Sequence, residues 1–250
     1  MPKNAEPTRK PLLTYALIAV CLIVFLWEAY GSMAYGKDWT KEMFSTYGFS
    51  SDGLLKGEWW TPLTSLFVHA TPDHLILNMI ALFFFGRALE EHLDRKKCLL
   101  VFFASGLAGE GAVMVATALG VMPAAIPTIG ASAAIFGLMA AAVLVKPFEL
   151  VAYPYIIPLP LIVVAVVYSL YNVLAFLTVV ATGAATTVAY ASHFGGLAAG
   201  VFLGLRFEGA KRGLMVLALV TVILVAIPLI WNLVQSLQAL NYTAIFSGPK

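Results

Sequence analysis

The chain has 250 residues, of which 61% are hydrophobic and only 11% are charged, and its formal net charge is +2. An ordinary soluble domain is about half apolar and a quarter charged. The apolar excess therefore excludes an ordinary soluble protein and predicts a chain that lipid largely surrounds. Cys21 and Cys98 lie on different predicted spans, with no disulfide framework or metal-ligand spacing.

Apolar runs along the chain predict seven membrane-spanning helices. The first run is expected to be a retained span, because no clear signal-peptide cleavage site follows it. Residues 31–71 are too polar to span, and their aromatic side chains are typical of the membrane interface. The predicted spans are residues 12–30, 72–89, 98–120, 132–145, 155–180, 188–205 and 214–233.

The basic residues predict a cytoplasmic N-terminus. In that orientation the cytoplasmic side holds all of the 15 Lys and Arg residues except Lys37, Lys41, Lys56 and Lys250. Residues 31–71 and the C-terminal tail are then expected on the extracytoplasmic side.

Ser132, His193 and His74 are predicted to lie at one depth on three different spans. A helix rises about 1.5 Å per residue, so the distance to the basic residue at the cytoplasmic end of a span gives a height. Ser132 lies 14 residues before Lys146, or about 21 Å. His193 and His74 each lie 13 residues before the basic residue that ends their span, or about 20 Å. All three are therefore expected below the outer surface of a hydrocarbon core about 30 Å thick.

Small residues indicate that two of these spans pack closely. Gly196, Gly200 and Gly204 recur every four residues, and the first two lie on the helix face of His193. The span of Ser132 is also rich in small residues, which makes it the natural partner. Asn78 follows His74 by four residues and is expected on the same helix face.

Each of these residues alone has a structural interpretation. A serine in a membrane helix usually bonds to its own backbone, and an intramembrane asparagine often joins two helices. A lone histidine at the interface is often structural, and repeated glycines alone indicate packing. The coincidence at one depth favours a functional site, because intramembrane polar groups are costly to bury.

The set allows nucleophilic catalysis. The hydroxyl of Ser132 needs a base, and His193 can serve. His74, Asn78 and the backbone N–H of Ser132 can stabilise an oxyanion. No carboxylate is placed to orient His193, so we expect a dyad whose histidine is held by packing, with Phe136 able to stack on its ring. Hydrolysis at this depth also requires a water-accessible cavity open to the outer side.

His74-x-x-x-Asn78, Gly130-x-Ser132 and His193-x-x-Gly196, in this order on separate spans, resemble the motifs of the rhomboid intramembrane serine proteases. The resemblance covers about residues 12–206. It implies that Ser132 is the nucleophile, that His193 is the base and later the acid, and that His74 and Asn78 form the oxyanion hole. The residues expected to support the site are Gly130, Phe136, Gly196, Gly200 and His69.

The expected fold is an all-α membrane protein: a polytopic helix bundle with the six-span core that the resemblance implies, and a seventh span that the apolar pattern adds. The expected parts are a cytoplasmic tail (1–11), the six-span rhomboid core (12–206), a linker with the seventh helix (207–236) and an extracytoplasmic tail (237–250). Residues 59–70 would belong to a membrane-embedded loop, and the fifth span would be a lateral gate for substrate helices.

The expected substrates are transmembrane proteins, cut near a helix-destabilising stretch by an enzyme without metal or other cofactor and without a nucleic-acid partner. The expected location is the plasma (inner) membrane, with the site opening to the extracytoplasmic side. Three departures from the family pattern stand out. Ala133 replaces a common glycine and Phe136 a tyrosine, whereas Trp59-Trp60 replaces Trp-Arg, which would remove an anchoring interaction of the loop.

Two other functions stay open. One is a catalytically inactive relative that binds membrane helices for trafficking or degradation. The other is a transporter with polar groups along a path, although paired broken helices and symmetric halves are not evident. Glu110, in the middle of an apolar span, is either a structural hydrogen-bonding group or part of a proton or ion path. His69, Asp73 and His74 together would make an incomplete metal site.

Overall fold

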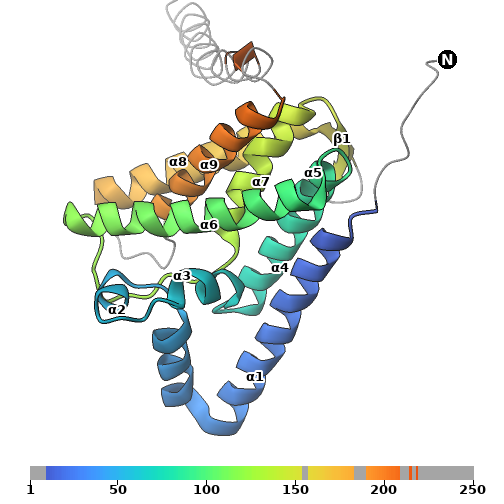
Figure 1. Ribbon diagram of the computed structural model, residues 1–250. Coiled ribbons are helices and arrows are strands. Elements are labelled where there is room, and N and C mark those ends of the chain that lie inside the picture. Colours follow the sequence, from blue (N-terminus) through green and yellow to red (C-terminus); the bar gives the residue numbers. More distant parts are fainter. Residues whose placement is uncertain (1–9, 154–156, 183–189, 209–213, 216–217, 219–250) are drawn as a thin grey trace, which may run out of the picture.

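The computed structural model describes residues 10–153, 157–182, 190–208, 214–215 and 218. These residues form a bundle of helices with one short β-hairpin (Figure 1). Almost all of the predicted N-terminal tail, the predicted seventh span and the tail at 237–250 lie outside the described residues, so their boundaries stay predictions.

Several helices in the described part are suited to a membrane. Three are long and apolar enough to cross it: α1 (Leu12–Tyr47), α6 (Arg95–Ala118) and residues 161–178 of α8 (Leu161–Thr182). A fourth span results if the segments 61–67 and 72–90, which meet at 92°, count as one. The chain is therefore a helical, multi-pass integral membrane protein, and the arrangement of six spans plus one stays a prediction.

Helix α1 is longer than the predicted first span, because it continues into the predicted interfacial segment. The helix reverses at Gly36, whose φ of +80° favours glycine (Figure 1). Trp39 and Tyr47 beyond the reversal pack edge-on against Trp27, with ring centroids 5.4 and 5.5 Å apart. At the other end, buried Glu90 accepts hydrogen bonds from the N–H groups of Leu13 and Thr14, at 2.8 Å each.

The rest of the predicted interfacial segment forms short helices that lead to a bent span. These helices are α2 (Ser51–Leu55), α3 (Thr61–Thr64) and η1 (Ser65–Phe67). The indole N–H of Trp60 donates to the carbonyl of Thr46 at 2.8 Å, so Trp60 links this segment to the end of α1 by a contact of its own.

The predicted second span is interrupted by a π-helical turn. It consists of α4 (Pro72–Ala81), the π-turn η2 (Leu82–Gly86) and α5 (Arg87–Glu90). Thr71 caps α4 by accepting from the N–H of His74 at 3.3 Å, and Pro72 occupies the first helical position, where its missing N–H costs nothing. The cap fixes the point where the chain leaves the short helices and enters α4.

Helices α6, α7 (Ser132–Val145) and α9 (Tyr190–Glu208) pack together, and α7 has the predicted bounds. Every residue of α7 after Ser132 is buried. A Cβ at Gly196 would collide with the carbonyl oxygen of Ala133, and one at Gly200 with that of Gly137. The two backbones therefore touch, as small residues at four-residue spacing allow.

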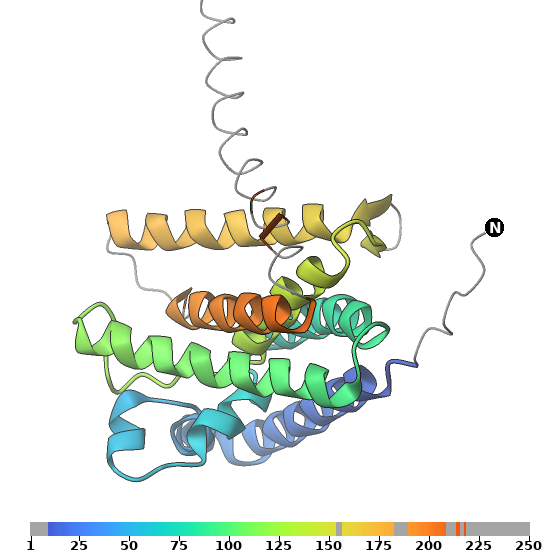
Figure 2. The ribbon, with the colours of Figure 1, turned by 45° about the horizontal axis from the view of Figure 1, so that its top comes forward.

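A β-hairpin separates α7 from α8. Strand β1 (Leu150–Tyr153) pairs antiparallel with β2 (Ile157–Pro160), and α8 then begins at Leu161. The predicted start of the fifth span at residue 155 is therefore wrong, because Pro158 and Pro160 favour extended backbone before the helix. Figure 2 shows α8 as an outer layer, with α9 between it and α6.

Candidate active site

Ser132 is the first residue of α7 and is partly exposed. The turn before it depends on Gly130, whose φ is +114° and whose N–H donates to the carbonyl of Ser65 at 2.8 Å. A first helical residue has no carbonyl within the helix to accept its N–H. The hydroxyl and the backbone N–H of Ser132 are therefore presented together at a helix start.

His193 lies in the first turn of α9 and is buried. Its Nε2 is 2.7 Å from the Oγ of Ser132, although the two residues are 61 positions apart in the chain. The close approach of α7 and α9 at Gly196 allows this distance. The structure thus brings together the hydroxyl and the imidazole that the sequence placed at one depth.

Contacts on two sides hold the imidazole. The ring of Phe136 stacks on it with centroids 4.6 Å apart and an interplanar angle of 18°. Tyr168 of α8 lies on Phe136 in turn, at 5.3 Å. The Nδ1 of His193 is 2.6 Å from the Oδ1 of Asn172, also on α8. Packing by Phe136 was expected from the sequence, whereas the hydrogen bond to Asn172 was not.

His74 and Asn78 reach the backbone immediately before Ser132. A Cβ at Gly130 would lie 2.7 Å from the Nε2 of His74 and 3.5 Å from the Nδ2 of Asn78. Asn78 is buried, and its Nδ2 has no hydrogen-bond partner among the described residues. A buried amide without a partner is costly, so this donor is available to a ligand at the site.

His69 lies next to His74, with ring centroids 5.1 Å apart. His69 is buried, and its ring Nδ1 is 3.0 Å from the carbonyl oxygen of Phe67. Its backbone N–H donates to the carboxylate of Glu28 at 3.3 Å. No group of three or more His, Cys, Asp or Glu residues in the described part of the chain is arranged to hold a metal ion. His69 thus supports the wall behind His74.

Glu110 links the helix η1 to the loop before α7. Its carboxyl group accepts from the hydroxyls of Ser65, at 3.0 Å, and Thr128, at 2.9 Å. Ser65 is also the residue that receives the N–H of Gly130. These contacts favour the structural interpretation of Glu110, because they use the carboxyl group to fix the turn that presents Ser132.

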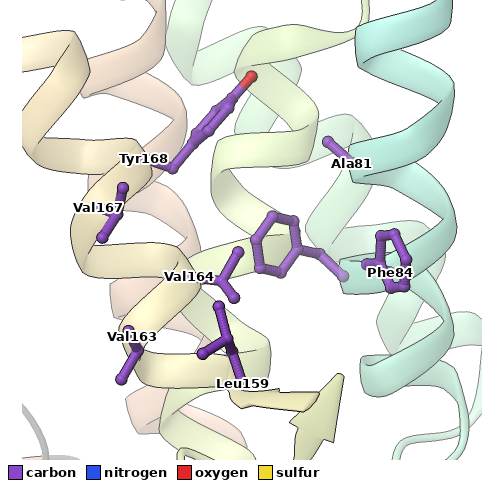
Figure 3. Close-up of a pocket in the computed structure, with 8 residues that line it drawn as sticks. Ala81, Phe84, Leu159, Val163, Val164, Val167 and Tyr168 are labelled. Carbon is purple, nitrogen blue, oxygen red and sulfur yellow. The ribbon is translucent and has the colours of Figure 1, made fainter. Parts of the chain in front are cut away.

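An apolar cavity of about 140 Å³ lies beside the site, between α8 and the α4–η2 segment. Figure 3 shows Val163, Val164 and Val167 on one wall and Ala81 and Phe84 facing them. Tyr168 also lines the cavity, and its contact with Phe136 connects the cavity to the ring of His193. Two aromatic rings therefore link the wall of the cavity to the imidazole.

Sequence reasoning did not single out Asn172, although a signal was present. It is an amide on an otherwise apolar helix, and intramembrane polar residues mark functional sites by default. With the span starting at residue 155, Asn172 would lie 17 residues from the cytoplasmic end, or about 26 Å. From the observed start at Leu161 the distance is 11 residues, or about 17 Å, which is closer to the level of the other groups.

Fold and geometry together define a polytopic helical membrane protein with a serine–histidine pair at the start of a buried helix. Residues 56–209 match the Rhomboid domain. The chain belongs to the rhomboid family.

Several curated relatives are similar over part of the chain. Rhomboid protease GluP of Bacillus subtilis (strain 168) is 34% identical over 53% of this chain and 24% of its own length. The putative rhomboid protease YdcA of the same organism is 32% identical over 51% of this chain and 59% of its own length. Rhomboid protease AarA of Providencia stuartii is 29% identical over 61% of this chain and 57% of its own length. The chain thus covers less than two thirds of each of these relatives.

Proposed function

We propose that the chain is an intramembrane serine endopeptidase that hydrolyses peptide bonds in or near the transmembrane segments of membrane proteins. The observation that carries the proposal is the 2.7 Å contact between the Oγ of Ser132 and the Nε2 of His193. The names of the relatives, which include rhomboid proteases, support it.

In the proposed mechanism, His193 takes the proton of Ser132 while the Oγ attacks the scissile carbonyl carbon. The oxyanion that forms receives hydrogen bonds from the backbone N–H of Ser132, the Nδ2 of Asn78 and the ring of His74. His193 then protonates the leaving amine, and water hydrolyses the acyl-enzyme by the reverse sequence of proton transfers. No metal or other cofactor takes part in these steps.

The Nδ2 of Asn78, without a partner in the described part of the chain, supports the assignment of the oxyanion hole. Native proteins pair most buried polar groups, and this donor lies beside Gly130, two residues before the nucleophile. An oxyanion next to Ser132 would supply the missing acceptor. The positive φ of Gly130 lets the backbone pass where a side chain would collide with His74.

The apolar cavity supports lateral access from the membrane. Its walls are apolar side chains of α8 and of the α4–η2 segment (Figure 3), which suit a transmembrane helix better than a soluble peptide. We propose that substrates reach Ser132 between these two helices, so α8 acts as the gate. The proposed setting is the plasma (inner) membrane, with a six-span core, a cytoplasmic N-terminus and a site that opens to the extracytoplasmic side.

The test is cleavage of a reporter membrane protein with one transmembrane segment, reconstituted with the chain in liposomes. Wild type should release the reporter, and Ser132→Ala should release none. Ser105→Ala is the matched control, because this serine is buried on α6 and takes no part in the contacts that hold His193. Equal release by wild type and Ser132→Ala would refute the protease.

The alternative is an inactive relative that binds membrane helices. It predicts that the same reporter is retained by wild type and by Ser132→Ala alike, without release of a fragment. Comparison of the membrane proteins shed by cells with wild type and with Ser132→Ala would then identify natural substrates if the protease is correct.

A further inference from the structure

We infer that Asn172 is the positioning residue of His193, so that the site is a serine–histidine–asparagine triad whose third member comes from α8. The inference rests on the proposed protease and deepens it. The observation that carries it is the 2.6 Å contact between the Oδ1 of Asn172 and the Nδ1 of His193.

This contact selects one tautomer of the imidazole. An amide oxygen only accepts hydrogen bonds, so with Oδ1 facing the ring the contact is a hydrogen bond when the proton resides on Nδ1. Nε2 then carries the lone pair, and it is 2.7 Å from the Oγ of Ser132. That is the tautomer required of a general base for Ser132, because the opposite tautomer would present an N–H to the hydroxyl and could not take its proton.

The burial of Asn172 supports a specific role. Asn172 and His193 are both buried, with 6% and 8% of their surface exposed. Helix α8 has no charged residue, and an amide in such a span is costly unless it is bonded. An asparagine also holds the histidine in the Cys-His-Asn proteases, so a neutral amide can fill this position.

Helix α8 also supports the histidine indirectly, through Phe136. Tyr168, one turn before Asn172, lies on Phe136, which in turn stacks on the ring of His193. Tyr168 also lines the cavity, whereas Asn172 does not. The helix proposed to admit substrate therefore also sets the orientation of the base, and removal of the amide should change the chemical step more than substrate binding.

The first test is the tautomer of His193 in the wild-type protein. Nitrogen-15 NMR of histidine-labelled protein in detergent distinguishes protonated from unprotonated ring nitrogens, and His193→Gln identifies the signal among the four histidines. We expect a protonated Nδ1 and an unprotonated Nε2 in the resting enzyme. A protonated Nε2 would overturn the inference, whereas cleavage of the reporter by wild type is measured separately and tests the proposed function.

The second test uses Asn172→Leu, which removes the acceptor at similar volume, and Asn172→Asp, which keeps one. Asn172→Leu should lower kcat for the reporter about 10- to 100-fold, part of what general-base catalysis contributes, at unchanged KM. It should also erase the tautomer preference in the NMR spectrum. Asn172→Asp should recover most of kcat, because a carboxylate accepts the same Nδ1 proton.

Tyr171→Leu is the control, since it changes the adjacent residue of α8, which is 69% exposed. Its kcat and NMR spectrum should match wild type. A lower thermal stability of Asn172→Leu with unchanged kcat would show a merely structural bond and overturn the inference. The inference is also overturned if kcat falls while the tautomer is retained, or if Asn172→Asp is as slow as Asn172→Leu. Absence of cleavage by wild type would instead refute the proposed function.

Discussion

Helix α7 has two faces that are packed in opposite ways. Towards α6 and α9 the contacts involve glycine, and backbone meets backbone at Gly196 and Gly200. Towards α8 the contact is made by large side chains, Phe136 on Tyr168, and a cavity of about 140 Å³ lies beside it, between α8 and the α4–η2 segment. The Nδ2 of Asn78, which has no partner among the described residues, lies on this side, next to Gly130.

The difference indicates that the two faces have different roles around Ser132. Contacts between backbones cannot adjust to an added atom, so the first face fixes the distance between Ser132 and His193. Side chains can move between rotamers, so the second face can admit a ligand. Substitutions on the first face should therefore affect folding, and those on the second should affect activity.

The largest effect is expected for Gly196→Ala, which breaks the first face. Its Cβ would collide with the carbonyl oxygen of Ala133. We expect a loss of about 3 kcal/mol, the upper end of the range for overpacked cores, together with loss of activity. Thermal unfolding in detergent measures the change.

Gly111→Ala is its matched control on α6, because a Cβ there has no described residue within 4 Å. It should be neutral or stabilise the helix by up to about 1 kcal/mol. Equal stability of the two variants would show that the glycine face is not tightly packed.

Asn78→Ala tests the second face. The proposed oxyanion donor would be lost, and kcat should fall about 100- to 1000-fold, while stability should change little because the Nδ2 has no partner among the described residues. Ser105→Ala, which also removes a buried polar atom without a described partner, should keep full activity. A stability loss in Asn78→Ala with unchanged kcat would contradict the assignment.

Gly130→Ala should lower both the stability and the activity moderately. The φ of +114° is strained for alanine, which costs about 1–3 kcal/mol, and the methyl group would press on His74 and so shift the turn before Ser132. Gly57→Ala has a similar φ of +98°, but no described residue lies within 4 Å of its Cβ. Both variants should lose stability, and reporter cleavage should fall in Gly130→Ala alone. Equal cleavage by the two would mean that the turn does not position Ser132.

The smallest effect is expected for Ala81→Leu, which partly fills the cavity. Cleavage of a transmembrane reporter should fall about tenfold, whereas labelling of Ser132 by a small fluorophosphonate should not change, because that probe does not need the cavity. Ala198→Leu, at an exposed position of α9, is the control and should cleave normally. A parallel loss of labelling in Ala81→Leu would indicate a distorted site instead of blocked access.

The sequence predicted the core of this arrangement from a few residues. The bounds of α7 were correct because Gly130 and Lys146-Pro147 mark its ends clearly, and helix rise alone placed Ser132 and His193 at one level. The catalytic roles of these residues stay predictions. The chemistry of the site could be inferred because its hydroxyl, imidazole and amide groups are rare in apolar spans.

Features that depend on tertiary contacts could not be predicted. The reversal of α1 at Gly36 needs the aromatic cluster around Trp27, and no local pattern marks the π-turn η2. The hairpin before α8 shifted the start of that helix by six residues, from 155 to 161, and so concealed the level of Asn172. Ala133, a departure from the family pattern, packs against Gly109 of α6. A Cβ added at Gly109 would lie 2.6 Å from the Cβ of Ala133.

The most direct measurement of the central claim is labelling with a fluorophosphonate, followed by mass spectrometry to locate the modified residue. An activated serine reacts with this probe, and an ordinary serine does not. We predict one label, on Ser132, that disappears in Ser132→Ala, falls strongly in His193→Ala and persists in Ser105→Ala. An unlabelled wild type, or a label that persists in Ser132→Ala, would contradict the assignment of Ser132 as the nucleophile.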